Sequence, residues 1–153
     1  MRRADRAVTE FADWVDILQR ADTLHLALHD QPYPYVVPLS FGLEADPARG
    51  ITLYFHGAME GKKHDLLRAN PHVCVEASVF YQYKETGSSV TTVYESVIGR
   101  GVAERVWGAE AAKGLDLLMA HCGHADTTYP PEALDHTAVY RIALTSVTGK
   151  RNR

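Results

Sequence analysis

Six stretches of the chain predict β-strands, and four of them alternate apolar with polar residues, as strands with one buried face do. The clearest is residues 51–56, in which Ile51, Leu53 and Phe55 fall on one face. The others are residues 23–29, 33–41, 72–78, 91–106 and 137–147.

Three further stretches have apolar residues at helical spacing. Thr9 can cap the first of them, residues 10–20. Its apolar face consists of Phe11, Trp14, Val15 and Leu18. The other two are residues 64–70 and 109–121. The polar stretches 42–50 and 82–89 predict loops, the second of them mobile.

The helices are inserted singly among the strands, and strand and helix do not alternate regularly, which argues against a doubly wound sheet. We therefore expect an α+β protein that is mainly β: a small antiparallel barrel with helices packed outside. Pro34 and Pro38 cannot donate to a strand ladder, so residues 33–41 should form an edge strand. Gly99 and Gly101 predict a bulge or bend.

Length and charge narrow the class of protein. At 153 residues the chain fits one domain, residues 1–153. Its net charge of −3 gives no electrostatic case for a nucleic acid or an anionic membrane as partner. No apolar run approaches the ~20 residues of a membrane span. The two cysteines, Cys74 and Cys122, do not suggest a disulfide framework, and we expect a cytoplasmic protein.

The segment that follows residues 51–56 has the chemistry of a phosphate site. Gly57 and Gly61 let a backbone come close to a ligand, and Lys62 and Lys63 stand at the start of a helix, where free N–H groups favour an anion. The alternative is a tight turn with two solvated lysines. A nucleotide P-loop is excluded, because Lys63 stands where such a loop needs Ser or Thr.

Several side chains outside this segment carry weaker indications. His56 follows the strand on its polar face and is either a proton donor or a structural histidine. The run HCGHAD (121–126) contains metal-ligand types, but its spacing matches no common zinc pattern. Arg100 and Glu104 share a strand face and suit an ion pair. The basic end of the chain, 150–153, is expected to be solvated.

Several sequence blocks in a fixed order resemble one family, the FMN-binding split-barrel proteins related to pyridoxamine 5′-phosphate oxidase. The likeness is greatest to the subgroup that contains the nitroimidazole-resistance proteins. The blocks are YPYVVPLSFG (33–42), LYFHGA (53–58), GKKHDLLRANP (61–71), SVIGRGVA (96–103) and VTGKRN (147–152).

The resemblance implies a six-stranded antiparallel split β-barrel with flanking helices, a homodimer with FMN at its interface. The flavin ring would run along the backbone of Tyr35, Val36, Val37, Pro38 and Leu39. It would lie beside His56, Gly57 and Ala58, with the phosphate on Gly61, Lys62 and Lys63. Ser96, Val97 and Ile98 would complete the site, from the same chain or across the dimer.

The function implied is that of an FMN-dependent oxidoreductase, with His56 as the candidate catalytic residue. It would pass electrons from NAD(P)H to a small, flat acceptor such as a nitroaromatic. The segment that grips the substrate in true pyridoxamine phosphate oxidases is not seen, which argues against that activity. Some relatives use haem or deazaflavin. The alternatives are a haem- or flavin-binding protein without turnover, with His56 or His64 as iron ligand, and an empty barrel that serves as an interaction module.

Overall fold

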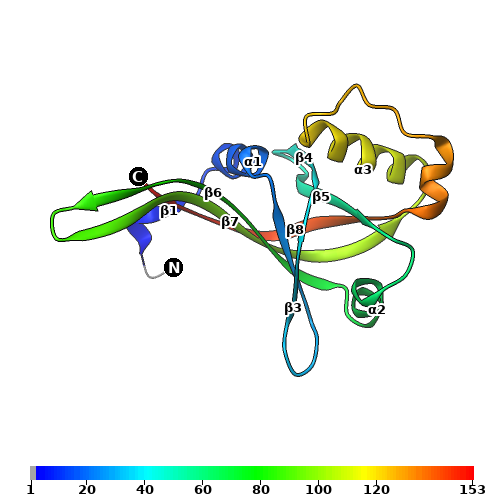
Figure 1. Cartoon of the computed structure of the whole chain (residues 1–153), viewed down its shortest axis with the longest axis horizontal. Coiled ribbons are helices and arrows are strands. Elements are labelled where there is room, and N and C mark those ends of the chain that lie inside the picture. Colours follow the sequence, from blue (N-terminus) through cyan, green and yellow to red (C-terminus); the bar gives the residue numbers. More distant parts are fainter. Residues whose placement is uncertain (1–2) are drawn as a thin grey trace.

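A computed structural model describes residues 3–153, and its centre is one antiparallel sheet of eight strands (Figure 1). The strands are β1 (Ala7–Val8), β2 (Leu24–Leu28), β3 (Tyr35–Leu39), β4 (Gly42–Asp46), β5 (Gly50–Gly57), β6 (His72–Thr86), β7 (Ser89–Val106) and β8 (Ala138–Asn152). The helices are α1 (Phe11–Arg20), α2 (Lys62–Ala69) and α3 (Gly108–His121), with 3-10 turns η1 (Ala4–Arg6) and η2 (Pro131–His136).

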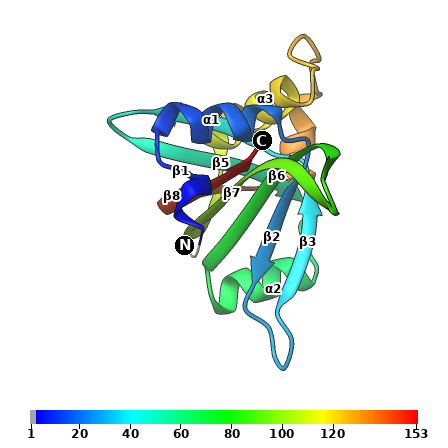
Figure 2. The ribbon, with the colours of Figure 1, turned by 90° about the vertical axis from the view of Figure 1, so that its left-hand side faces the viewer.

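The strands lie in the order β3-β2-β6-β7-β8-β5-β4, and β1 pairs with β8. Helices α1 and α3 lie at one side of the twisted sheet, and α2 lies at the opposite side, next to β2 and β3 (Figure 2). The order leaves β3 and β4 as the two edges. The mainly β fold class is therefore confirmed, and the prolines of β3 stand on an edge strand as predicted.

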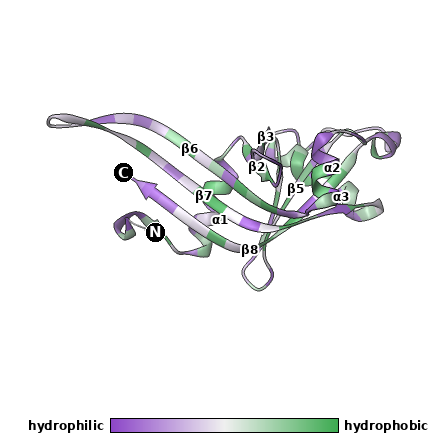
Figure 3. Cartoon of the chain, turned by 90° about the horizontal axis from the view of Figure 1, so that it is seen from below, coloured by the Kyte–Doolittle hydropathy of each residue, from purple (hydrophilic) through white to green (hydrophobic). Residues whose placement is uncertain are grey.

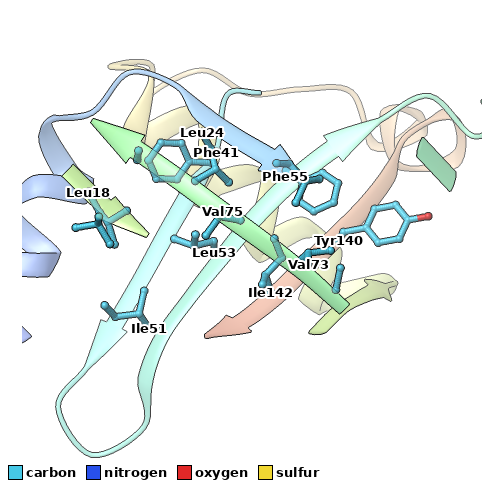
Figure 4. Packing of buried hydrophobic residues seen from close by; sticks show 14 of the residues in the cluster. Leu18, Leu24, Phe41, Ile51, Leu53, Phe55, Val73, Val75, Tyr140 and Ile142 are labelled. Atoms are coloured by element: carbon cyan, nitrogen blue, oxygen red, sulfur yellow. The ribbon is translucent and has the colours of Figure 1, made fainter. Parts of the chain in front are cut away.

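The core lies between the inner faces of the curved sheet, and it follows the alternation read from the sequence. In β2 the side chains of Leu24, Leu26 and Leu28 are buried, while His25 and His29 are exposed. Each large side chain that is fully buried contributes about 1.5–3 kcal/mol of hydrophobic free energy. Figure 4 shows how the buried side chains of β2, β5, β6 and β8 converge on one another.

The predicted bulge occurs where β7 pairs with β8. The register shifts between Arg100 and Gly101, which leaves Thr145 of β8 without a cross-strand partner. The Thr145 hydroxyl instead donates to the Arg100 carbonyl at 3.2 Å. At Gly101 a side chain would collide with the backbone carbonyl of Ala143, so only glycine fits this close approach.

The prediction of six strands was wrong, because two short strands were missed. Residues 42–50 are not a loop: β4 forms a hairpin with β5, and its turn is fixed by Asp46, whose carboxylate accepts from the Ala48 N–H at 2.7 Å. β1 is only two residues long. Such a short strand has no alternation to detect.

The prediction of a mobile loop at 82–89 was also wrong. β6 and β7 continue as paired strands to a turn at Gly87 and Ser88, and they form a two-stranded arm that extends away from the rest of the chain (Figures 1 and 3). Both faces of the arm are exposed, and they carry polar as well as apolar residues. The sequence therefore shows none of the alternation that marks a half-buried strand.

Helix α1 begins at Phe11 rather than at residue 10, and Thr9 does not cap it. The Thr9 hydroxyl contacts the Glu10 carboxylate instead. The expected apolar face does pack on the core, and Ile17 adds a fully buried side chain to it. The Trp14 indole N–H donates to the Val8 carbonyl at 2.7 Å.

Two expectations for charged residues were wrong. Glu104 pairs with Arg141 at 2.8 Å, not with Arg100. The basic end of the chain is not a free tail, because Lys150 and Arg151 belong to β8. Figure 3 shows this end of β8 as hydrophilic, but the partner of Arg151 is a buried carboxylate on β7.

That carboxylate is Glu95, which is 2% exposed at the base of the β6–β7 arm. It accepts from Arg20 of α1 at 2.6 Å, and also from Tyr81 of β6 and Arg151 of β8. Burial alone would raise the pKa of Glu95. The hydrogen bonds from Tyr81, Arg20 and Arg151 outweigh burial and lower that pKa to about 2. One carboxylate thus ties a helix and three strands together.

Glu95→Gln should destabilise the chain by about 3 kcal/mol at pH 7, because it leaves two arginines with an incompletely paired buried partner. Since the folded-state pKa lies below the ordinary 4.5, the stabilisation is present above pH ~4.5. It is lost as pH falls toward 2, so the variant and the wild type should converge in acid. Urea unfolding from pH 7 to pH 3 measures this. A constant difference across that range would contradict the role given to Glu95.

Candidate functional site

The candidate site begins where β5 ends. β5 pairs with the first residues of β8, so that Phe55 lies opposite Tyr140 and Gly57 opposite Ala138. The rings of Phe55 and Tyr140 are nearly parallel, with centroids 5.1 Å apart, at one end of the core (Figure 4). Alternation along β5 then places Phe55 inward and the next side chain, His56, outward.

The chain then turns into α2 at Gly61, which has φ +132°, a region that favours glycine. The Gly61 carbonyl accepts the first helical hydrogen bonds, from the N–H groups of His64 and Asp65. Lys62 and Lys63 therefore occupy the first two helical positions, where backbone N–H groups have no acceptor within the helix. The helix starts at Lys62, two residues earlier than the expected residue 64, and it includes both lysines.

The structure distinguishes the two lysines, which the sequence could not. The Lys62 ammonium forms a 2.6 Å ion pair with Asp30, in the loop between β2 and β3. It also lies 5.2 Å from the centre of the Tyr35 ring. Lys62 thus joins α2 to the start of β3, and its charge is already balanced within the chain.

Lys63 is half-buried and has no carboxylate partner among residues 3–153. Its ammonium donates a long 3.4 Å hydrogen bond to the His56 carbonyl and lies 5.3 Å from the centre of the Phe55 ring. A Cβ at position 57 would meet the Lys63 nitrogen at 2.8 Å, so Gly57 makes room for this side chain. Burial lowers the pKa of Lys63. An anion beside this ammonium would be strongly favoured.

Burial and the neighbouring Lys63 together determine the pKa of His56. Desolvation of the imidazole and, second, the positive charge of Lys63 lower the pKa of His56. The neutral imidazole is therefore the prevailing form near neutral pH. Its ring is exposed next to the turn that leads into α2 and contains Gly61, Lys62 and Lys63, here called the lysine turn. In that state one ring nitrogen can donate a hydrogen bond and the other can accept one.

His64, by contrast, is a structural residue. It is 5% exposed, and its Nε2 bonds the Ala58 carbonyl, which can only accept, so Nε2 carries the proton. Nδ1 then accepts from the Tyr140 hydroxyl at 2.6 Å. Burial raises the pKa of Tyr140, which keeps that hydroxyl protonated. Both ring nitrogens are engaged, so the idea of His64 as an iron ligand is wrong for this conformation.

The edge strand β3 reaches the same region through Tyr35. Tyr35, Val37 and Leu39 pack on the core, while Val36 and Pro38 face outward. Because β3 is an edge, its outer backbone groups are not paired with another strand of the described chain. The structure thus brings together the start of β3, the end of β5 and the start of α2.

The predicted residues of β7 lie elsewhere. Val97 pairs with Gly149, whereas Gly57 pairs with Ala138, and these partners stand near opposite ends of β8. At about 3.3 Å per residue, the two positions are tens of ångströms apart. Val97 is buried, and Ile98 is 46% exposed. Within one chain, Ser96, Val97 and Ile98 do not join the other site residues.

The sequence reading missed Asp30 and Tyr140 as neighbours of the lysine turn. Asp30 also lines a cavity of about 660 Å³ between the β2–β3 loop and strands β6, β7 and β8. The only signal was the turn Asp30-Gln31-Pro32 before the edge strand. Nothing local links that turn to a lysine 32 positions later.

The run HCGHAD is not gathered into a ligand set. His121 Nε2 bonds the Ala21 carbonyl at 2.9 Å, and its ring packs on Phe41. Among residues 3–153, no three His, Cys, Asp or Glu side chains cluster closely enough to hold a metal ion. Within the same range, no helix combines the length and the apolar character that crossing a membrane requires.

Comparison with known proteins identifies the class. The model of the pyridoxamine 5′-phosphate oxidase family matches residues 11–151. The chain therefore belongs to that family, whose members include FMN-binding split barrels. The predicted resemblance is confirmed. No curated protein matched significantly.

Solved structures extend the comparison. A candidate 5-nitroimidazole antibiotic resistance protein from Bacteroides thetaiotaomicron is 29% identical, with a TM-score of 0.83 over 94% of this chain and 85% of that one. An FAD-binding protein from Mesorhizobium loti is 25% identical, with a TM-score of 0.66 over 97% and 98%. An FAD and haem binding protein from Mycobacterium smegmatis, 19% identical, shares the fold with a TM-score of 0.75 over 97% and 74%. The cofactor prediction, FMN with haem as alternative, agrees with the flavin named for two of these neighbours and the haem named for one of them.

Lys63→Met should raise the pKa of His56, because it removes a nearby positive charge. Lys62→Met should change that pKa much less, since the Lys62 charge is balanced by Asp30. The measurement is an NMR titration of the His56 ring protons in the three proteins. Equal effects of both substitutions would show that the two lysines are not distinguished in solution.

Proposed function

We propose that this chain is an FMN-dependent oxidoreductase that works as a homodimer. When bound, FMN would supply the redox chemistry, accepting hydride from NAD(P)H and reducing a small, flat acceptor of the nitroaromatic type. The observation that carries the proposal is the Lys63 ammonium, a partly buried cation with no carboxylate partner in the described chain, beside free helix N–H groups. Family membership and the nitroimidazole-resistance relative support the same function.

The residues at the start of α2 suit the binding of a flavin phosphate. Lys63 and the N–H groups at the start of α2 would bind it, while Lys62, held by Asp30, would keep α2 next to β3. The backbone of β3 from Tyr35 to Leu39 would offer hydrogen bonds along the ring edge. His56, neutral at pH 7, would donate a hydrogen bond to the acceptor as it is reduced.

A second subunit would explain two features of the surface. The predicted residues of β7 lie too far from Lys63 to join its site within one chain, but a partner could bring them there. Large apolar side chains are also exposed in the described chain, as expected of an interface. They include Val36, Phe80, Tyr83, Val90, Ile98 and Trp107.

The alternative is a haem- or flavin-binding protein without turnover, as the name of the FAD and haem binding neighbour from Mycobacterium smegmatis allows. The histidine that remains for iron is His56, since both ring nitrogens of His64 are engaged. An absorption spectrum of the purified protein separates the cases. Flavin bands that remain through gel filtration support the proposal, and a Soret band would favour haem.

Lys63→Ala should weaken FMN binding at least about tenfold, or ~1.4 kcal/mol, because it removes a charge-assisted contact. Lys62→Ala is the matched control and should have a smaller effect, exerted through the position of α2. Quenching of flavin fluorescence during titration measures both affinities. Unchanged FMN affinity in Lys63→Ala would place the phosphate elsewhere.

Mixed dimers test whether the site is shared between subunits. A Lys63→Ala chain paired with an Ile98→Gln chain has one site with both defects and one with neither. If β7 of the partner completes the site, the mixed dimer should regain tight FMN binding at about one site in two. No recovery in mixed dimers of confirmed mass would show that each site uses a single chain.

A further inference from the structure

A second, smaller cavity lies between α2, β7 and β8 and is not used by the proposed function. Its volume is about 230 Å³. Apolar groups, one histidine and two arginines line it: Met59, His64, Leu67, Arg68, Ala103, Arg105 and Tyr140. Met59 belongs to the segment between His56 and Lys62, so this cavity adjoins the candidate cofactor site along the chain.

Arg105 of β7 has an incompletely used guanidinium. Its Nε is buried and has no hydrogen-bond partner among residues 3–153. On the same edge of the group, Nη2 contacts only the Met59 sulfur, at 3.1 Å. A thioether is a weak acceptor, so this edge lacks the strong acceptor that a buried arginine normally has. No ion pair compensates the charge of Arg105 within the described range.

The guanidinium is nevertheless held in place. Its central carbon lies 5.5 Å from the centre of the Trp107 ring, which is a favourable cation–π distance. The neighbouring Glu104 does not neutralise it, because Glu104 is paired with Arg141 at 2.8 Å. An ordered guanidinium with a free edge costs little to organise when a ligand arrives.

The free edge consists of Nε and Nη2, which is the geometry that receives two oxygens of a planar carboxylate. Arg68 adds a second positive charge to the cavity wall, and its contact with Asp65 is long, at 3.9 Å. The remaining walls, from Met59, Leu67 and Ala103, suit an apolar body rather than a second charged group. The volume leaves room for a carboxylate with a small apolar or aromatic substituent.

We propose that this cavity is a binding site for a small monocarboxylate, held by the Nε–Nη2 edge of Arg105 with Arg68 as a second cation. The ligand would be an acid with a compact apolar body, such as an aromatic carboxylate. The site uses only residues of one chain. It does not depend on the proposed flavin, so its test is independent of that function.

The test is a titration of the ¹⁵N-labelled protein with sodium benzoate, with sodium chloride at the same ionic strength as reference. The Arg105 Nε–H resonance should shift along a saturable curve with benzoate but not with chloride. Trp107 fluorescence should follow the same curve. Both readouts come from the wild-type protein, so they do not depend on a variant that folds.

Two variants locate the binding. Arg105→Lys keeps the charge but removes the planar edge, and it should weaken benzoate binding at least tenfold. Arg100→Lys is the matched control on the same strand, and it should leave the curve unchanged. A linear or chloride-like response would overturn the site, as would equal binding by Arg105→Lys. Tighter binding of inorganic phosphate than of benzoate would overturn the choice of a carboxylate.

Discussion

The pairing of β8 with its neighbours is the constraint on which the rest of the structure depends. β8 runs for 15 residues and pairs with β7 over most of its length, with β5 at its first half and with β1 near its end. One end of β8 therefore sets where Gly57 and the lysine turn lie. The other end delivers Arg151 to the buried Glu95. The candidate site and the main polar network are placed by one ladder.

Side-chain direction and distant partners explain why residues of the same type have different roles. Lys62 and Lys63 are adjacent, but Asp30 balances only the first, because the helical direction points the two side chains to different neighbours. His56 and His64 differ in the same way. One is exposed at a strand end, while the other is held between a carbonyl and a tyrosine hydroxyl. Charge that the fold leaves unbalanced marks where a ligand is favoured.

The sequence predicted those features that have a local cause. The alternation in β2 and β5, the proline edge of β3, the glycine bulge and the glycine-lysine turn all follow from residues close together in the chain. The β6–β7 arm was missed because both of its faces are exposed, which removes the period that marks a strand. β8 extends beyond its apolar half because Arg151 pairs with the buried Glu95, 56 positions away.

The candidate site likewise combines residues that local sequence predicts with partners that it does not. The residues that form the turn could be named from spacing, but the partners that decide their roles are distant in the sequence. Asp30, Tyr140 and Arg105 reach the turn only through β2, β8 and β7. The distance between Val97 and Gly57 also depends on sheet register, which the sequence pattern did not specify.

The β6–β7 arm has a consequence for how the molecule opens. A two-stranded ribbon with both faces in water is marginally stable by itself. Residues 80–90 of the arm are exposed, so its attachment depends on contacts at its base, among them the Glu95 network. The arm should therefore be a separate unit of low local stability, able to unzip from its tip while the ladder of β5 and β8 stays closed. The protein then combines a rigid body with a ribbon whose order a neighbouring molecule can supply.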